Sequence, residues 1–132
     1  MKQVTRKSTQ AFSASLSLGL QRGYSDKLFD KEDIIKWIQQ YQEQLIRNSG
    51  IYLSVAVSDS FIVLREQREP HLVISFINYP KFLIEENRLR KEIEQLALAL
   101  MSEFDQNRMV IEYADETVMF EYTDGVDPRV LM

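Results

Sequence analysis

Hydrophobic side chains alternate strictly with small ones along residues 12–20, FSASLSLGL. A period of two places every large apolar side chain on one face, which is typical of a β-strand with one buried side. The opposite face carries only serine and glycine. Because a sheet must bury its apolar face against another layer, the chain needs further elements that cover one side of this strand.

Two later segments have helical spacing instead. Residues 31–48 follow Asp30, a good N-cap, and end before Gly50, which can adopt the left-handed conformation that often closes a helix. Apolar residues recur every three or four positions in this segment and again in residues 84–105. Both segments are therefore predicted to be amphipathic helices.

The remaining apolar segments are predicted to be strands. Residues 51–57 alternate, and residues 61–64 either continue that strand or begin another. A charged turn at 65–70 precedes residues 71–79, HLVISFINY, which are apolar on both faces. A strand of that kind is usually central in its sheet.

Two short strands at 108–113 and 117–122 complete the order strand, helix, strand, strand, helix, strand, strand. This order predicts an α+β fold, a ferredoxin-like βαββαβ sandwich with an extra C-terminal strand and both helices on one face of an antiparallel sheet. The length of 132 residues fits one domain, residues 1–132, with residues 1–10 and 124–132 as flexible tails.

The element order, the size, the extra C-terminal strand and the charged 65–70 turn resemble the small oligomeric ferredoxin-like proteins of the PII and CutA kind. The resemblance covers most of the chain at the level of the fold. It carries over no functional residue.

Two helices on one side leave the other side of the predicted sheet open. Ser13, Ser15 and Ser17 would lie there beside one apolar side of the 71–79 strand. Contiguous apolar surface usually marks an interaction site, so we expect a homo-oligomer that forms through the uncovered sheet face or the edge strands. The alternative is that the tail, residues 126–132, folds back over this face.

Composition excludes several classes of protein. Acidic residues outnumber basic ones by 20 to 16, which argues against a nucleic-acid partner. No apolar run approaches the roughly 18 residues that span a bilayer, and no secretory pattern is present, so we expect a cytoplasmic protein without a membrane partner. Without cysteine and with one histidine, no metal site and no cofactor are expected.

A first candidate site follows if strands 12–20 and 71–79 are parallel, since their C-terminal ends would then meet. That end would combine an arginine fork, tyrosine faces and a lysine, which suit a small anionic or planar ligand. The candidate ligand-binding residues are Arg22, Tyr24, Asn78, Tyr79 and Lys81. The alternative is an ordinary pair of loops around a packed tyrosine.

A second candidate site surrounds His71 at the opposite end, with Arg68, Glu69 and Asp115. A nearby carboxylate would make His71 a pH-sensitive partner. Catalysis would also need a nucleophile or a second acid, which the sequence does not supply. The alternative is a histidine at a strand end that is hydrogen-bonded to an acid or to the backbone.

The order of the elements, the uncovered sheet face and the absence of a recognisable catalytic set together lead us to expect a non-enzymatic homo-oligomer that senses a small ligand or has a regulatory role. Two alternatives remain open. One is a small enzyme that acts on an anionic small molecule, and the other is a protein-binding module of the inhibitor or immunity type.

Overall fold

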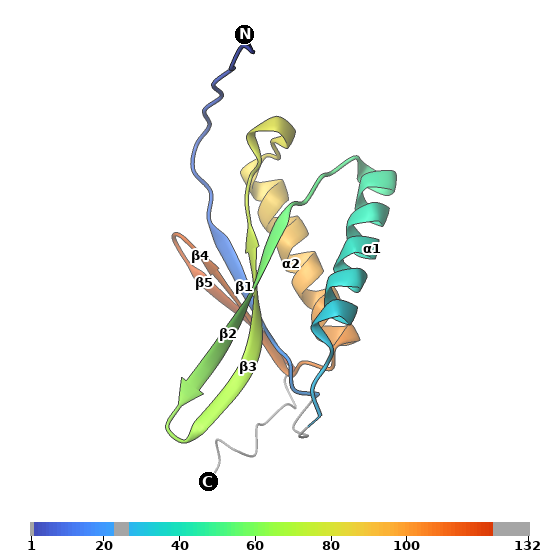
Figure 1. Cartoon of the computed structure of the whole chain (residues 1–132), viewed down its shortest axis with the longest axis vertical. Coiled ribbons are helices and arrows are strands. Elements are labelled where there is room, and N and C mark those ends of the chain that lie inside the picture. Colours follow the sequence, from blue (N-terminus) through green and yellow to red (C-terminus); the bar gives the residue numbers. More distant parts are fainter. Residues whose placement is uncertain (1, 23–26, 123–132) are drawn as a thin grey trace.

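The computed structural model describes residues 2–22 and 27–122. Within these residues, five strands form one sheet and two long helices pack on one of its faces (Figure 1). The strands are β1 (Ala14–Gly19), β2 (Val55–Leu64), β3 (Gln67–Phe76), β4 (Arg108–Tyr113) and β5 (Thr117–Glu121). The helices are α1 (Lys31–Ser49) and α2 (Glu86–Glu103), and a short 3₁₀ turn, η1 (Pro80–Phe82), precedes α2.

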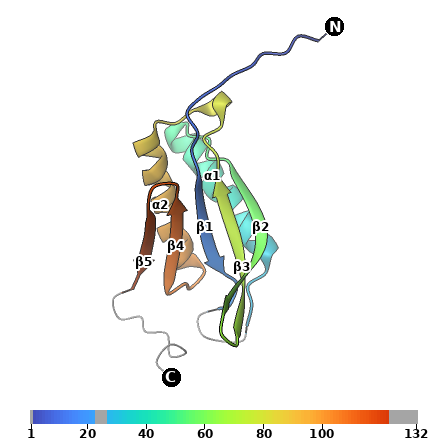
Figure 2. The same cartoon turned by 90° about the vertical axis from the view of Figure 1, so that its left-hand side faces the viewer.

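The strand order is β2-β3-β1-β4-β5, and every neighbouring pair is antiparallel. The first four strands have the ferredoxin-like order, and β5 extends the sheet beside β4. Figure 2 shows the sheet in front of both helices, which leave its other face uncovered. The predicted fold class is confirmed.

The large apolar side chains that alternate with serines along β1 form the centre of the core. Leu16 and Leu18 are completely buried under the helices, whereas Ser15 and Ser17 lie half-buried on the open face. Ile74 of β3 and Ile111 of β4 flank Leu16 in register and are also fully buried. Burying such a side chain stabilises the fold by roughly 1.5–3 kcal/mol, so this row anchors the two helices to the sheet.

Local capping fixes the ends of α1. The Asp30 carboxylate accepts from the backbone N–H of Glu32 at 2.9 Å, and Gly50 closes the helix with a φ of 66°.

Among the described residues, no helix is both long enough and apolar enough to cross a membrane. The cytoplasmic location stays a prediction.

The hairpin between β2 and β3 is longer than the sequence indicated. β2 is one continuous strand of ten residues, and β3 begins at Gln67, so most of the predicted 65–70 turn is paired strand. Only Arg65 and Glu66 make the turn, with Arg65 at a φ of 56°. The distal half of this hairpin, residues 61–70, is called the arm here; it extends past the ends of the helices (Figure 1).

The open face of the sheet mixes small, apolar and charged side chains and is not a continuous apolar strip. Ser17 lies between Val73 and Val110, and Ser15 lies between Ser75 and Glu112. The serines interrupt the apolar surface that the 71–79 strand was expected to expose. The tail that was considered as its cover, 126–132, lies outside the described residues.

A side chain continues the ladder where the β1–β4 pairing ends. The backbone N–H of Gly19 donates to Gln106 Oε1 at 3.1 Å, and Gln106 Nε2 donates to the carbonyl of Phe104 at 2.9 Å. A Cβ on residue 19 would come within 2.9 Å of the same oxygen, so a larger residue there would displace the Gln106 side chain from this position. Gln106 therefore joins the end of α2 to the end of β1.

Replacing Gln106 with alanine should lower the free energy of unfolding by about 1–3 kcal/mol, because Gly19 N–H and Phe104 C=O lose their partner. Urea denaturation followed by circular dichroism measures the change. The matched control is Gln95→Ala on the exposed side of α2, which should stay within about 0.5 kcal/mol of the wild type. Equal losses in both variants would contradict the role given to Gln106.

Candidate functional site

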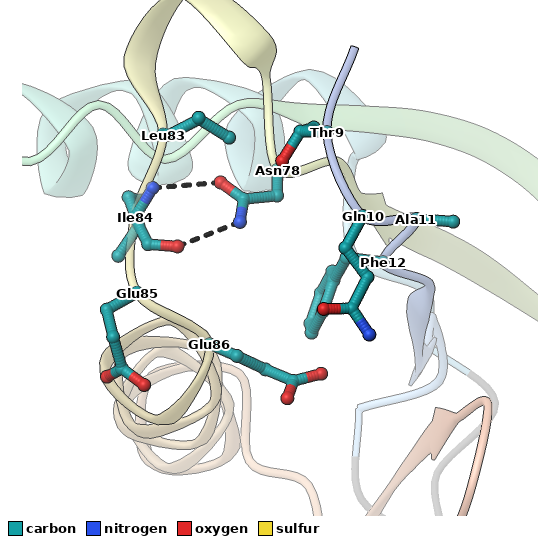
Figure 3. Close-up of a pocket in the computed structure, with 9 residues that line it drawn as sticks. All are labelled: Thr9, Gln10, Ala11, Phe12, Asn78, Leu83, Ile84, Glu85 and Glu86. Carbon is teal, nitrogen blue, oxygen red and sulfur yellow. Dashed lines mark hydrogen bonds between the residues drawn. The ribbon is translucent and has the colours of Figure 1, made fainter.

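A cavity of about 300 Å³ lies between the segment before β1 and the connection from β3 to α2 (Figure 3). Because β1 and β3 are antiparallel, the beginning of one lies beside the end of the other, and these two segments become neighbours. The cavity is lined by Thr9, Gln10, Ala11, Phe12, Asn78, Leu83, Ile84, Glu85 and Glu86. It is the candidate functional site and is called the pocket below.

Asn78 holds one wall of the pocket in place. Its Nδ2 donates to the carbonyl of Ile84 at 2.8 Å, and its Oδ1 accepts from the N–H of Ile84 at 2.9 Å (Figure 3). Both polar groups of the side chain thus make hydrogen bonds within the loop that carries η1. Asn78 was predicted to bind a ligand, and it lines the pocket, but its amide supports the loop.

Two consecutive glutamates face the pocket from the start of α2. Glu85 is the N-cap, and its two carboxylate oxygens accept from the N–H groups of Asn87 and Arg88, each at 3.0 Å. The Glu86 side chain extends instead toward Gln10 and Phe12 on the opposite wall (Figure 3). Glu86 is therefore the carboxylate that an occupant of the pocket would meet.

Behind Glu86, the Arg90 guanidinium joins α2 to the turn between β4 and β5. Its Nη2 lies 2.8 Å from Asp115 Oδ1 and 3.6 Å from Glu86 Oε1, and its Nη1 lies 3.3 Å from Glu116 Oε1. The guanidinium also stacks 4.3 Å above the Tyr113 ring. The hydrogen bond from Arg90 holds the pKa of Asp115 below its ordinary value.

Tyr113 closes this cluster from the sheet side. Its hydroxyl donates to Glu94 Oε2 at 3.1 Å, and the Phe12 ring of the pocket meets its ring edge-on at 6.4 Å. Burial raises the pKa of Tyr113 well above its ordinary value, and the hydrogen bond to Glu94 raises it further. The phenol therefore stays a neutral donor over the physiological range.

An exposed group of aromatic rings surrounds η1. Tyr52 and Phe82 are stacked with centroids 4.7 Å apart, Tyr79 lies 6.4 Å from Phe82, and the Lys81 ammonium is 5.7 Å from the Phe82 ring. Tyr79 and Lys81 were both predicted to bind a ligand. They lie at the same end of the sheet as Asn78, but they do not line the pocket.

The first predicted site is not assembled as expected, because its premise of parallel strands is wrong. β1 and β3 are antiparallel, with Gly19 opposite His71, so Arg22 lies at the other end of the sheet from Asn78, Tyr79 and Lys81. The Arg22 guanidinium is 5.5 Å from the Phe29 ring. Tyr24 lies outside the described residues.

The residues of the second predicted site also lie at opposite ends of the sheet. His71, Arg68 and Glu69 follow one another on β3, whereas Asp115 lies beyond Tyr113, which pairs with Ala14 at the opposite end of β1. His71 Nδ1 lies 3.2 Å from the Glu69 carbonyl oxygen, which matches the alternative of a strand-end histidine bonded to backbone. Asp115 instead belongs to the Arg90 cluster behind the pocket.

Sequence reasoning missed Phe12 and Glu86 as pocket residues. Phe12 was assigned to the buried face of the first strand, and Glu86 lies in the first turn of a helix, where acidic residues are common. A reader of the sequence could have found them only by placing the segment before β1 beside the start of α2. Across residues 2–22 and 27–122, no group of three or more histidine, aspartate or glutamate side chains is arranged to hold a metal ion.

No protein-family model matches this sequence, and no curated protein matches it. Two solved structures are similar in fold. One is described as a phage SAM lyase in complex with S-methyl-5'-thioadenosine; it has a TM-score of 0.64 and 18% identity, and the match covers 95% of this chain and 100% of that chain. The other, a phage SAM lyase in the apo state, has a TM-score of 0.66 and 16% identity over 92% of this chain and 98% of that chain.

These structures contradict the expectation of a non-enzymatic sensing or regulatory protein, because both carry the same fold and both are described as lyases. The expectation that the chain is not an enzyme is wrong for the same reason. It was based on the order of the elements, the uncovered sheet face and the lack of a recognisable catalytic set, and none of these excludes every kind of reaction. The resemblance to proteins of the PII and CutA kind stays a prediction.

The raised pKa of Tyr113 predicts a loss of stability at alkaline pH. Above about pH 10 the phenol loses its proton in the unfolded chain but keeps it in the folded one, so the free energy of unfolding falls as the pH rises. Tyr113→Phe should make this fall shallower. Tyr41, whose pKa is raised by burial and by the charge of Glu92, would account for part of the slope that remains.

Urea denaturation at several pH values between about 8 and 11 measures the slope. The matched control is Tyr122→Phe, which removes a hydroxyl from a side chain that is 52% exposed. If the two variants have equal slopes, the Tyr113–Glu94 contact does not control the alkaline behaviour.

Proposed function

We propose that this chain is a small enzyme that cleaves S-adenosylmethionine (SAM) in the pocket and releases S-methyl-5'-thioadenosine. The observation that carries the proposal is the likeness over the whole length of a SAM lyase that holds S-methyl-5'-thioadenosine. The match covers 95% of this chain and 100% of that chain.

The chemistry of SAM explains why few catalytic groups are needed. S-methyl-5'-thioadenosine keeps the sulfur, its methyl group and the adenosyl group, so the bond that breaks joins the sulfur to the four-carbon amino acid chain. The electron pair of that bond goes to the sulfonium, which becomes a neutral thioether. A lyase adds no water, and the carbon fragment either loses a proton or closes onto its own carboxylate. The leaving group is supplied by the substrate, and the protein contributes orientation and electrostatics.

The pocket has properties that suit such a substrate. Its volume of about 300 Å³ is at the lower end of the roughly 300–1,000 Å³ of small-molecule sites. Its lining includes the Phe12 ring and the carboxylates of Glu85 and Glu86, and neither Arg22 nor Lys81 belongs to it. We therefore propose a cationic ligand for the pocket, in place of the anionic ligand expected from the sequence.

The purified chain should convert SAM to S-methyl-5'-thioadenosine faster than SAM decomposes in buffer. Liquid chromatography of timed samples measures the product, and the heat-unfolded chain is the control for contaminating catalysts that survive heating. The rate should increase in proportion to the protein concentration when SAM is in excess. A product yield equal to that in buffer alone would contradict the proposed reaction.

We also propose that the chain forms a homo-oligomer through the β2 edge and the arm. β2 is an edge strand of the described sheet, and four consecutive apolar side chains near its end, from Phe61 to Leu64, are 45–66% exposed. Exposed edges of this kind usually carry charges, prolines or bulges that prevent pairing with another chain. The one charged residue of β2, Asp59, is paired with Lys31 at 2.5 Å.

Ile62→Lys should convert an assembled chain to a monomer, because it places a charge in the centre of the exposed apolar run. Size-exclusion chromatography with light scattering measures the mass. The matched control is Leu98→Lys on α2, since Leu98 is 48% exposed and Ile62 is 45% exposed. A wild-type chain that is monomeric at micromolar concentration would contradict the proposed assembly.

A further inference from the structure

We infer that the Glu86 carboxylate is the counter-ion for the ammonium group of the substrate; this inference rests on the proposed cleavage of SAM. Both carboxylates of the pocket belong to the start of α2, but Glu85 is already engaged by two backbone N–H groups at 3.0 Å. The Glu86 side chain is 56% exposed and extends across the pocket toward Gln10 and Phe12 (Figure 3). It is the charged group that remains accessible to an occupant.

Arg90 is paired with this carboxylate at long range and shares its single charge with two others. The distance from Arg90 Nη2 to Glu86 Oε1 is 3.6 Å, whereas the same nitrogen lies 2.8 Å from Asp115 and Nη1 lies 3.3 Å from Glu116. One guanidinium thus faces three carboxylates. The lining of the pocket contains two carboxylates and neither lysine nor arginine, so a cation is attracted at this short range.

SAM offers two positive groups, and the reaction distinguishes between them. The sulfonium loses its charge as the carbon–sulfur bond breaks, so a carboxylate beside it would stabilise the substrate more than the transition state and would slow cleavage. The ammonium group keeps its charge throughout. A carboxylate at the ammonium group binds the substrate without raising the barrier, and Glu86 is assigned to that group.

Three ligands separate the contribution of the ammonium group to binding from that of the sulfonium. SAM has the ammonium and the sulfonium, S-adenosylhomocysteine has the ammonium and a neutral sulfur, and S-methyl-5'-thioadenosine has neither charge. Glu86→Gln should raise the KM for SAM in initial-rate assays and the Kd for S-adenosylhomocysteine in isothermal titration calorimetry, each about 10- to 100-fold, and should leave the Kd for S-methyl-5'-thioadenosine within about twofold. Glu86→Asp keeps the charge and should retain part of the affinity.

Glu103→Gln is the matched control, because it removes an exposed carboxylate from the last turn of the same helix. It should leave all three affinities unchanged, and circular dichroism checks that each variant is folded. If Glu86→Gln weakens the binding of SAM but not that of S-adenosylhomocysteine, the Glu86 carboxylate contacts the sulfonium and the inference is wrong. If all three ligands bind the wild type and no affinity changes in Glu86→Gln, the inference is wrong while the proposed function stands. If the wild type binds none of them, the proposed function fails and the inference falls with it.

Discussion

The antiparallel pairing of β1 with β3 decides which parts of this chain can act together. Ala14 lies opposite Phe76, so the segment before β1 and the loop after β3 leave the sheet at the same end. The start of α2 lies at that end as well, because a short connection joins Phe76, at the end of β3, to Glu86. The pocket, its two glutamates and the Arg90 cluster are therefore consequences of strand direction, and a parallel pairing would have separated them.

The fold was largely predictable because its signals are local. Helical spacing and the caps at Asp30 and Gly50 placed α1 within one residue of its observed end, and the bounds of β4 were predicted as observed. The strand at 71–79 was wrong at both ends, since its limits depend on distant partners. β3 begins at Gln67 because β2 pairs with it there, and it stops at Phe76 before Asn78 turns to bond the backbone of Ile84.

The candidate site was predictable only in part, because a list of suitable residue types does not contain the direction of the strands. Asn78, Tyr79 and Lys81 lie at one end of the sheet and Arg22 at the other. The role of Asn78 depends on a carbonyl and an N–H six residues along the chain. The accessibility of Glu86 depends on Glu85, which takes the capping role, and on Arg90, which binds Asp115 and Glu116 more closely.

The expectation of a non-enzymatic protein came from a search for a nucleophile, an acid and a base. That search suits reactions in which the protein must create a nucleophile or protonate a poor leaving group. A sulfonium leaves as a neutral thioether and needs no proton from the protein. The proposed reaction therefore needs a site that orients the substrate and holds its amino acid end. A chain with one histidine and no cysteine can provide that with a shaped cavity and one accessible carboxylate. For a substrate of this chemistry, the arrangement of charge around the cavity carries more information about function than the presence of a catalytic triad.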